Sequence, residues 1–236
     1  MANLYGPRIV TDGLVLHLDA GNRKSYPLSG STIYDLSGNG NDGAFGGSTA
    51  APTFNGDNGG CISFDGSNDL ITISNSSSLK PVSAMTIESF CYIQNNSTTW
   101  ASLIQYPYLS TSHSSPYFEW GIYLNMTSRS FHSRIDGVTA VNSNNSAWNF
   151  NEWSHIVLTY SSSVVRFYTN GVYVGGGGVA SSMSYNNPNN NILVGRNASA
   201  GEPFEGRIGS LKIYSKALSS GEITQNYNAL KGRFGL

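Results

Sequence analysis

The stretch from Trp153 to Val174 has the clearest pattern of apolar and polar positions in the chain. Two runs rich in Val, Ile, Tyr, Phe and Thr are separated by three serines, and Asn170-Gly171 follows the second run. Asn-Gly supplies the positive φ angles that a two-residue hairpin turn requires. The stretch therefore predicts an antiparallel meander of three strands. Its first run is apolar on both faces, with Trp153 and Val157 on one and Ile156, Leu158 and Tyr160 on the other, which predicts a wall of a sandwich.

Shorter strand patterns recur on both sides of this meander. They cover residues 14–19, 61–64, 70–73, 85–93, 102–106, 118–124, 131–135, 191–196 and 204–218. Near the end of the sequence, Ser219 and Glu222 have the spacing of a capping box, and Ile223, Tyr227 and Leu230 fall on one helical face. The pattern predicts an all-β protein with one short C-terminal helix. We expect one domain over residues 1–236, with residues 1–9 as an N-terminal arm and 231–236 as a C-terminal tail.

Composition limits the classes of partner. Only 11 % of residues are charged and the formal net charge is -1, whereas binding to a nucleic-acid backbone needs clustered Lys and Arg. No apolar run has the length of a membrane span or of a signal peptide. We therefore expect synthesis in the cytoplasm and neither nucleic-acid binding nor membrane insertion. Cys61 and Cys91 each lie in a predicted strand, where two buried thiols are favoured over a disulfide.

The loop from Tyr34 to Gly43 is dense in Asp, Asn and Gly. Carboxylate, amide and backbone oxygens in one tight turn are the ligands of a hard cation such as Ca²⁺, which makes Asp35, Asn39 and Asp42 candidate metal ligands. The spacing is not that of an EF-hand, because the required Glu is missing. A polar loop held by Asx turns is the alternative, and we favour it.

The segment from Asn95 to Asn151 is irregular and rich in aromatic residues among Ser, Asn and Pro. An aromatic ring stacks on the apolar face of a pyranose while amides bond its hydroxyls, so the segment suggests carbohydrate binding. The candidate binding residues are Trp100, Tyr106, Tyr108, Tyr117, Trp120 and Trp148. About half of these rings are expected to be core residues, the usual fate of an aromatic residue in a strand.

Glycoside hydrolysis needs two carboxylates that face one cleft. The loose candidates are Glu88, Glu119 and Asp136, and the short-spaced Glu-x-Asp-x-x-Glu strand motif of lectin-like glucanases is absent from the sequence. The four His residues are scattered and have neither the helix-borne pair of a metalloprotease nor a Cys partner. We therefore expect no catalytic activity.

Several motifs together resemble a known family. The runs NEWSHIVLTY, VRFYTNGVYVG, NILVGR and FEGRIGSLKIYSKALSSGEITQNYNAL, preceded by YDLSGNGNDG, ISFDGSNDLITI and MTIESFCYI, resemble a laminin-G-like, concanavalin A-like lectin domain over roughly residues 10 to 230. This resemblance implies a two-sheet antiparallel jelly-roll sandwich, sugar or protein binding, often a structural Ca²⁺, and no catalysis in most members. Many relatives carry an acidic pair where this chain has Gly209-Ser210, which weakens a calcium site that uses those carboxylates.

The segments GPRIVTDGLVLHLDAGNRKSYP and NYNALKGRFGL further resemble versions of this domain in structural proteins of tailed, especially marine, bacteriophages. This second resemblance implies a virion component, such as a capsid decoration, tail or fibre protein. Its partners would be other virion proteins, further copies of itself in a homo-oligomer, and host-surface glycans. The alternative is a bacterial carbohydrate-binding protein or a glycoside hydrolase of the concanavalin A-like superfamily.

Overall fold

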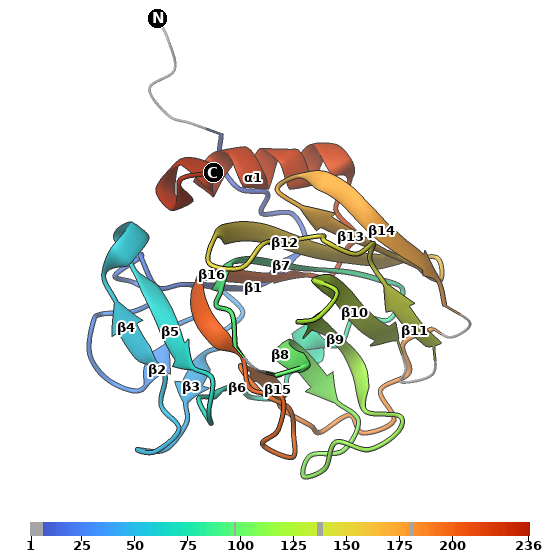
Figure 1. Ribbon diagram of the computed structural model, residues 1–236, viewed down its shortest axis with the longest axis horizontal. Helices are drawn as coiled ribbons and strands as arrows, with labels where there is room; N and C mark the ends of the chain where they lie inside the picture. The colour runs from blue at the N-terminus through green and yellow to red at the C-terminus, as the bar shows by residue number, and fades with distance from the viewer. Residues whose placement is uncertain (1–6, 97, 136–138, 180–181) are drawn as a thin grey trace, which may run out of the picture.

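A computed structural model describes residues 7–96, 98–135, 139–179 and 182–236 as two antiparallel sheets of eight strands each and one long helix (Figure 1). Sheet A has the order β14 (Val172–Gly178), β13 (Val164–Thr169), β12 (Trp153–Ser161), β7 (Ala84–Ile93), β16 (Glu205–Tyr214), β5 (Cys61–Asp65) and β4 (Thr53–Asn55), and β1 (Leu14–Asp19) also pairs with β16. Sheet B has the order β11 (Thr139–Asn142), β10 (Ser130–Ile135), β9 (Phe118–Asn125), β8 (Trp100–Pro107), β15 (Ile192–Val194), β6 (Ile71–Ile73), β3 (Gly43–Phe45) and β2 (Thr32–Ile33).

The two sheets pack face to face, which confirms the predicted all-β sandwich of the concanavalin A-like jelly-roll type. One large core of buried apolar residues fills the space between the sheets. Two short 3₁₀ helices, η1 (Asp57–Gly59) and η2 (Ser77–Leu79), lie in the connections. Among the described residues, no helix has the length and apolar character needed to cross a membrane.

The predicted meander is confirmed as β12, β13 and β14. Asn170 and Gly171 adopt φ angles of 52° and 80°, as the turn between β13 and β14 requires. Strand β12 is buried on both faces: Ile156 and Leu158 belong to the core between the sheets, whereas Val157 belongs to a separate cluster on the outer face. The prediction that this strand forms a wall of the sandwich is therefore confirmed.

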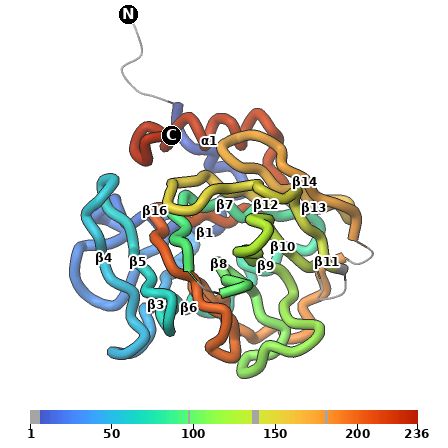
Figure 2. The backbone as a smooth tube through the Cα atoms, viewed as in Figure 1, coloured from blue at the N-terminus to red at the C-terminus, as the bar shows by residue number. Residues whose placement is uncertain are grey.

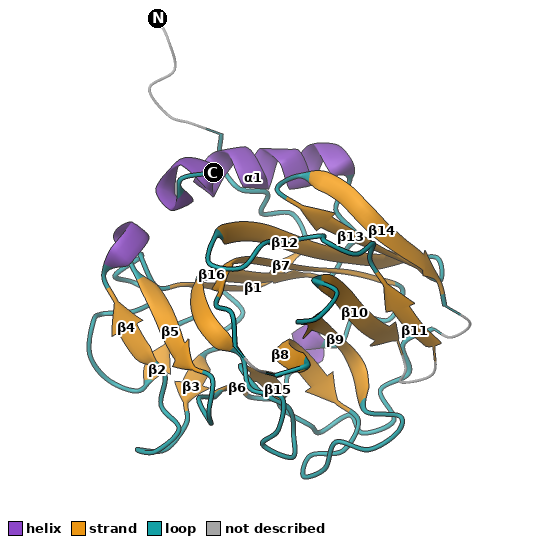
Figure 3. Cartoon of the chain, viewed as in Figure 1, coloured by secondary structure: helices purple, strands orange, loops and turns teal. Residues whose placement is uncertain are grey.

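Helix α1 (Ser220–Phe234) lies across the outer face of sheet A (Figure 3). The predicted capping box is present, because the Ser219 side chain accepts from the backbone N–H of Glu222 and the Glu222 side chain accepts from the backbone N–H of Ser219. The helix continues to Phe234, which is buried against sheet A, so residues 231–234 are not the free tail that we expected. The chain ahead of β1 runs beside the helix (Figure 2). The Asn226 side chain accepts a hydrogen bond there from the backbone N–H of Val10.

A buried ionic network joins α1 to sheet A. Glu88 on β7 and Lys212 on β16 are opposite each other in register, and both side chains have no exposed surface. The Nζ atom of Lys212 lies 2.8 Å from Oε1 of Glu88. The amide nitrogen of Asn226 on α1 donates to the other carboxylate oxygen at 2.6 Å, and Nε2 of His155 lies 3.5 Å from Oε1. Glu88, considered above as a catalytic candidate, is thus a structural residue beneath the helix.

Cys61 and Cys91 are both free and buried. They face opposite sides of sheet A, because Cys91 belongs to the core between the sheets and Cys61 belongs to the cluster beneath α1. Strand β16 also separates them, since Ile208 pairs with Cys91 on one side and with Ile62 on the other. The preference for two buried thiols agrees with this arrangement.

Iodoacetamide at neutral pH is expected to modify neither cysteine of the folded protein and both after denaturation. The thiolate is the reactive form, and burial raises the pKa of Cys61 to about 11 and that of Cys91 to about 12. Intact-mass measurement with and without urea, in the absence of a reductant, tests this. Resistance of the denatured protein to alkylation would instead indicate a disulfide.

Candidate functional site

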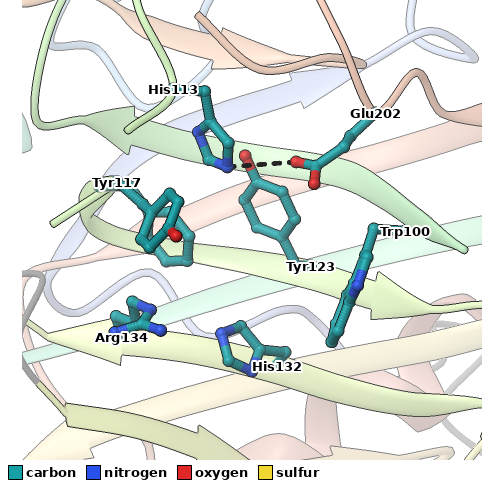
Figure 4. A pocket seen from close by; sticks show the side chains of 8 residues that line it. Trp100, His113, Tyr117, Tyr123, His132, Arg134 and Glu202 are labelled. Carbon is teal, nitrogen blue, oxygen red and sulfur yellow. Dashed lines mark ion pairs between the residues drawn. The ribbon is translucent and has the colours of Figure 1, made fainter. Parts of the chain in front are cut away.

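A pocket with a volume of about 220 Å³ lies on the outer face of sheet B. The alternation of strands β8, β9 and β10 produces it, because one set of side chains enters the core and the other set faces away from it. The side chains on the pocket side are Trp100 from β8, Tyr123 from β9, and His132 and Arg134 from β10 (Figure 4). Strand geometry therefore fixes half of the pocket.

Two connections supply the rest of the lining. The β8–β9 connection carries His113 and Tyr117 and leads into Phe118 at the start of β9, and the β15–β16 connection carries Glu202. Tyr117 has a φ of 73°, a left-handed conformation that non-glycine residues rarely adopt. The guanidinium carbon of Arg134 lies 5.1 Å from the centre of the Tyr117 ring, within the range of a cation–π contact.

Aromatic rings form the floor and the sides of the pocket. The rings of Phe118 and Tyr123 are nearly parallel, with centroids 4.8 Å apart, and the ring of His113 stacks on Tyr123 at 5.5 Å. Trp100 contacts His132 edge to face at 5.2 Å. Figure 4 shows Trp100 and Tyr117 on opposite sides of Tyr123. Phe118 and Tyr123 are only 2 % exposed and form a closed floor, so the accessible ring surface of the pocket comes mainly from the half-buried Trp100 and Tyr117.

A histidine–carboxylate pair lies at the rim of this aromatic surface. Nε2 of His113 is 3.2 Å from Oε2 of Glu202 (Figure 4). The same oxygen accepts a hydrogen bond from Nδ2 of Asn197 at 3.0 Å. Burial alone would raise the pKa of Glu202, but the hydrogen bonds from His113 and Asn197 outweigh burial and hold that pKa below its ordinary value. Glu202 is therefore a charged acceptor at neutral pH.

His132 contributes a neutral ring. Burial lowers its pKa below the ordinary value, so the imidazole is uncharged at neutral pH. Its Nδ1 lies 2.8 Å from the carbonyl oxygen of the Asn142 side chain, an atom that only accepts, so Nδ1 carries the proton. The other ring nitrogen, Nε2, is then an acceptor. The pocket combines aromatic faces with a cation, an anion and neutral hydrogen-bonding groups, a combination suited to a ligand that has both apolar faces and hydroxyls.

Only some of the six aromatic residues that the sequence indicated lie in the pocket. Trp100 and Tyr117 line the pocket together. Tyr106, Trp120 and Trp148 belong to the core between the sheets and do not line the pocket. Tyr108 is half-buried in the β8–β9 connection, where its carbonyl oxygen accepts from Nδ2 of Asn190, and it does not line the pocket.

Sequence reasoning missed the polar half of the site. His132 and Arg134 alternate with the buried residues Phe131, Ser133 and Ile135, so the period of two in this strand was a signal that they share its outer face. Tyr123 likewise alternates along β9 with residues that face the core. Glu202 and His113 belong to connections far apart in the sequence, and no local pattern indicates that they meet.

The candidate metal ligands in the loop from Tyr34 to Gly43 are engaged in hydrogen bonds with the protein itself. The carboxylate of Asp35 accepts hydrogen bonds from the backbone N–H groups of His17, Ser37 and Asn41 and from the Ser37 hydroxyl. Asp42 accepts from the backbone of Asp35, and the Asn39 amide donates to Ser37. The four hydrogen bonds to Asp35 occupy the four lone-pair positions of its carboxylate. Asx-turn hydrogen bonding therefore explains why Asp and Asn are dense in this loop. In the described part of the chain, no group of three or more His, Cys, Asp and Glu side chains is placed to hold a metal ion.

Of the three carboxylates considered for catalysis, the two that the structure describes do not line the pocket. Glu88 lies beneath α1, and Glu119 is 1 % exposed on β9. Asp136 lies outside the described residues. Among the described residues that line the pocket, Glu202 is the single carboxylate.

Comparison with solved structures shows the same fold in proteins of low sequence identity. The sialidase of Trypanosoma rangeli in complex with the inhibitor DANA matches with a TM-score of 0.67 and 14 % identity, over 93 % of this chain and 33 % of that one. The binding domain of Paraclostridial Mosquitocidal Protein 1 matches with a TM-score of 0.67 and 17 % identity, over 93 % of this chain and 52 % of that one. This chain thus spans about a third of the length of the sialidase.

Domain 4 of AbnA, an extracellular arabinanase of family GH43 from Geobacillus stearothermophilus, in complex with arabinotriose, matches over nearly its whole length. Its TM-score is 0.66 and its identity 18 %, and the match covers 91 % of this chain and 98 % of that domain. No curated protein matches the sequence. The family model described as the concanavalin A-like lectin/glucanases superfamily matches residues 65–224, more than half of the chain. Together with the two-sheet sandwich, this match shows that the chain belongs to the concanavalin A-like lectin/glucanase superfamily.

Proposed function

We propose that this protein is a non-catalytic, lectin-like module that binds a glycan in the pocket on the outer face of sheet B. The observation that carries the proposal is the arrangement of Trp100 and Tyr117 on either side of Tyr123, with the His113–Glu202 pair at the rim. Aromatic rings stack on the apolar faces of a sugar, and a charged acceptor with neighbouring donors orients its hydroxyls. Two of the matched structures, a sialidase and an arabinanase domain, are named for carbohydrate chemistry.

A glycan array probed with the purified protein tests this function. We expect selective, saturable binding to a small set of glycans, and isothermal titration of each hit gives its affinity. The matched control is Tyr173→Ala, which removes a 55 % exposed ring on β14, a strand of sheet A that does not line the pocket. Absence of binding to any glycan on the array, or equal loss of binding in this control variant, would contradict the proposal.

The proposal that the module is non-catalytic rests on the pocket chemistry. Most glycoside hydrolases use two carboxylates that flank the scissile bond, and Glu202 is alone among the described lining residues. Incubation with the glycans that bind is expected to release no reducing ends above a heat-inactivated control. Turnover that is lost in Glu202→Gln or Glu119→Gln would show that the protein is an enzyme.

We further propose that the module works on a phage virion, as a decoration, tail or fibre component that assembles with other virion proteins and with copies of itself. The resemblance of the N-terminal and C-terminal segments to phage structural proteins supports this setting. Val172 and Tyr173 on edge strand β14 are 65 % and 55 % exposed, which gives a neighbouring subunit apolar surface to cover. Peptide mass fingerprinting of purified particles of the source phage tests it, and particles that lack the polypeptide would contradict it.

A further inference from the structure

The connection from β15 to β16 is folded around the buried side chain of Asn197, which is 3 % exposed. The side-chain oxygen accepts from the backbone N–H groups of Ser199 and Gly201, at 3.0 and 2.8 Å, and from the Ser199 hydroxyl at 3.0 Å. Because a backbone N–H only donates, these bonds determine which end of the amide is the oxygen. The amide nitrogen, Nδ2, therefore faces away from the connection.

The backbone of the same connection is tightly turned. The backbone N–H of Asn197 donates to the carbonyl oxygen of Gly201 at 3.1 Å, and that of Ala200 donates to the carbonyl oxygen of Asn197 at 3.2 Å. Ala200 and Glu202 have φ angles of 62° and 52°. Non-glycine residues in this left-handed region persist only where their surroundings hold them there, and they are frequent at ligand sites. The bonds of the Asn197 side chain are part of what holds this backbone.

The Glu202 carboxylate is held at one of its two oxygens. Nδ2 of Asn197 donates to Oε2 at 3.0 Å, and Nε2 of His113 lies 3.2 Å from the same oxygen. The backbone carbonyl oxygen of Glu202 accepts from the N–H of Ser102 at 2.8 Å, which ties the residue to β8. In the described part of the chain, no donor is bonded to Oε1, and the side chain is 31 % exposed. The protein thus fixes one oxygen and leaves the other for a ligand.

The two donors to Glu202 differ in kind. Burial raises the pKa of Glu202, and the hydrogen bonds from His113 and Asn197 outweigh burial. An imidazole can gain or lose a proton, whereas an amide does not titrate, so the hydrogen bond from Asn197 is the one that stays the same at every pH. The titratable or charged side chains that line the pocket beside Glu202 are His113, Tyr117, Tyr123, His132 and Arg134.

We propose that Asn197 is a positioning residue of the sheet B pocket: its side chain folds the β15–β16 connection and aims the Glu202 carboxylate at the ligand. This role rests on the function proposed above for the pocket. Asn197 does not line the pocket, so it acts through Glu202. Removing its donor changes the acceptor that the ligand meets and takes away no surface that the ligand touches.

The variant Asn197→Asp tests the role in the protein without ligand. Aspartate keeps an oxygen for the N–H groups of Ser199 and Gly201, but it places a second carboxylate where Nδ2 donated to Glu202. Two neighbouring carboxylates resist being charged together, so the apparent pKa of Glu202 rises. The carboxyl ¹³C signal of Glu202, assigned from Glu202→Gln, should titrate below the ordinary value of 4.5 in the wild type. Its midpoint should be higher by about one pH unit or more in Asn197→Asp.

Glycan affinity should follow the same change. A carboxyl whose pKa is lowered stays charged until the pH falls through that lowered value, so the wild type should keep its affinity at about pH 5. There, Asn197→Asp should bind the best glycan of the array about tenfold more weakly than the wild type. The matched control is Asn22→Asp: Asn22 also accepts a backbone N–H, that of Lys24, and lies outside the pocket. This control should match the wild type in both midpoint and affinity.

A measurement on the wild type needs no variant to fold: the side-chain amide signals of Asn197 should shift with the same midpoint as the Glu202 carboxyl, because Nδ2 donates to it. Amide signals that do not follow this titration would overturn the proposal. An unchanged Glu202 midpoint, or unchanged glycan affinity at about pH 5, in an Asn197→Asp protein with the wild-type melting temperature would also overturn it. Absence of glycan binding by the wild type would instead remove the proposed function and the ligand role together. The midpoints are measured without ligand, so the two failures are distinguishable.

Discussion

Replacing Lys212 by Met is expected to lower the free energy of unfolding by about 3–5 kcal/mol, the usual cost of removing one partner of a buried ion pair. Glu88 and Lys212 have no exposed surface, and their charged atoms are 2.8 Å apart. Burial by itself raises the pKa of Glu88, but Lys212 and His155 outweigh it and hold that pKa far below its ordinary value. Without Lys212, the buried carboxylate loses its main counter-charge. Urea denaturation at pH 7 measures the loss.

Lys24→Met is the control for this prediction, because Lys24 is exposed and its loss should change the free energy of unfolding by no more than about 0.5 kcal/mol. The double variant Glu88→Gln, Lys212→Met should be more stable than Lys212→Met alone, since neither buried charge remains unpaired. A loss below about 1 kcal/mol in Lys212→Met would show that the pair does not anchor the network.

The Glu88–Lys212 pair also makes the free energy of unfolding depend on pH in the acid range. A carboxyl whose pKa is lowered by folding stabilises the native state above its unfolded value, here 4.5, and this contribution disappears as the pH falls toward the folded value. The stability of the wild type should therefore decrease below about pH 4.5 more steeply than that of the double variant.

Trp100→Ala is expected to weaken binding of the best glycan by about tenfold to a hundredfold, equivalent to about 1.4–2.8 kcal/mol. Trp100 is half-buried at one side of the sheet B pocket, where it contacts His132 edge to face, so its removal takes away a stacking surface and opens the pocket to water. Isothermal titration with the leading hit of the glycan array measures the effect.

Trp100→Phe should retain most of the affinity, because a ring remains in place. Tyr173→Ala, on the opposite sheet, should bind as the wild type does. The melting temperature of each variant shows whether the fold is preserved. Unchanged affinity in a folded Trp100→Ala variant would place the glycan elsewhere on the molecule.

The sequence indicated the parts of the fold whose signals are local. Asn170-Gly171 predicted a hairpin because its turn needs positive φ angles, and Ser219 with Glu222 predicted the start of α1 because a capping box needs only four consecutive residues. Both features are formed by neighbours in the chain, so long-range packing did not alter them.

The candidate site was predicted only in part because its chemistry comes from distant segments. Trp120 and Trp100 look alike in sequence, but Trp120 enters the core and Trp100 faces the pocket, a difference that depends on which face of sheet B the other sheet covers. Glu88 looked isolated because its partner Lys212 lies 124 residues away on a neighbouring strand. Glu202 meets His113 only through the folding of two connections.

Polar residues have different roles on the two sides of the sandwich. Beneath α1, every polar atom of the Glu88 carboxylate has a partner, and the network fastens the helix and the chain ahead of β1 to sheet A. On the outer face of sheet B, polar groups surround an open hollow instead. Both groups contain Glu and His, but the first is a structural network and only the second is a candidate binding site.

The most direct test of the central claim is a crystal structure of the protein with the best glycan from the array. We expect a sugar ring in the sheet B pocket, between Trp100 and Tyr117 and over Tyr123, with a hydroxyl bonded to Glu202. A glycan bound at another surface, with this pocket unoccupied, would show that the sheet B pocket is not the glycan site.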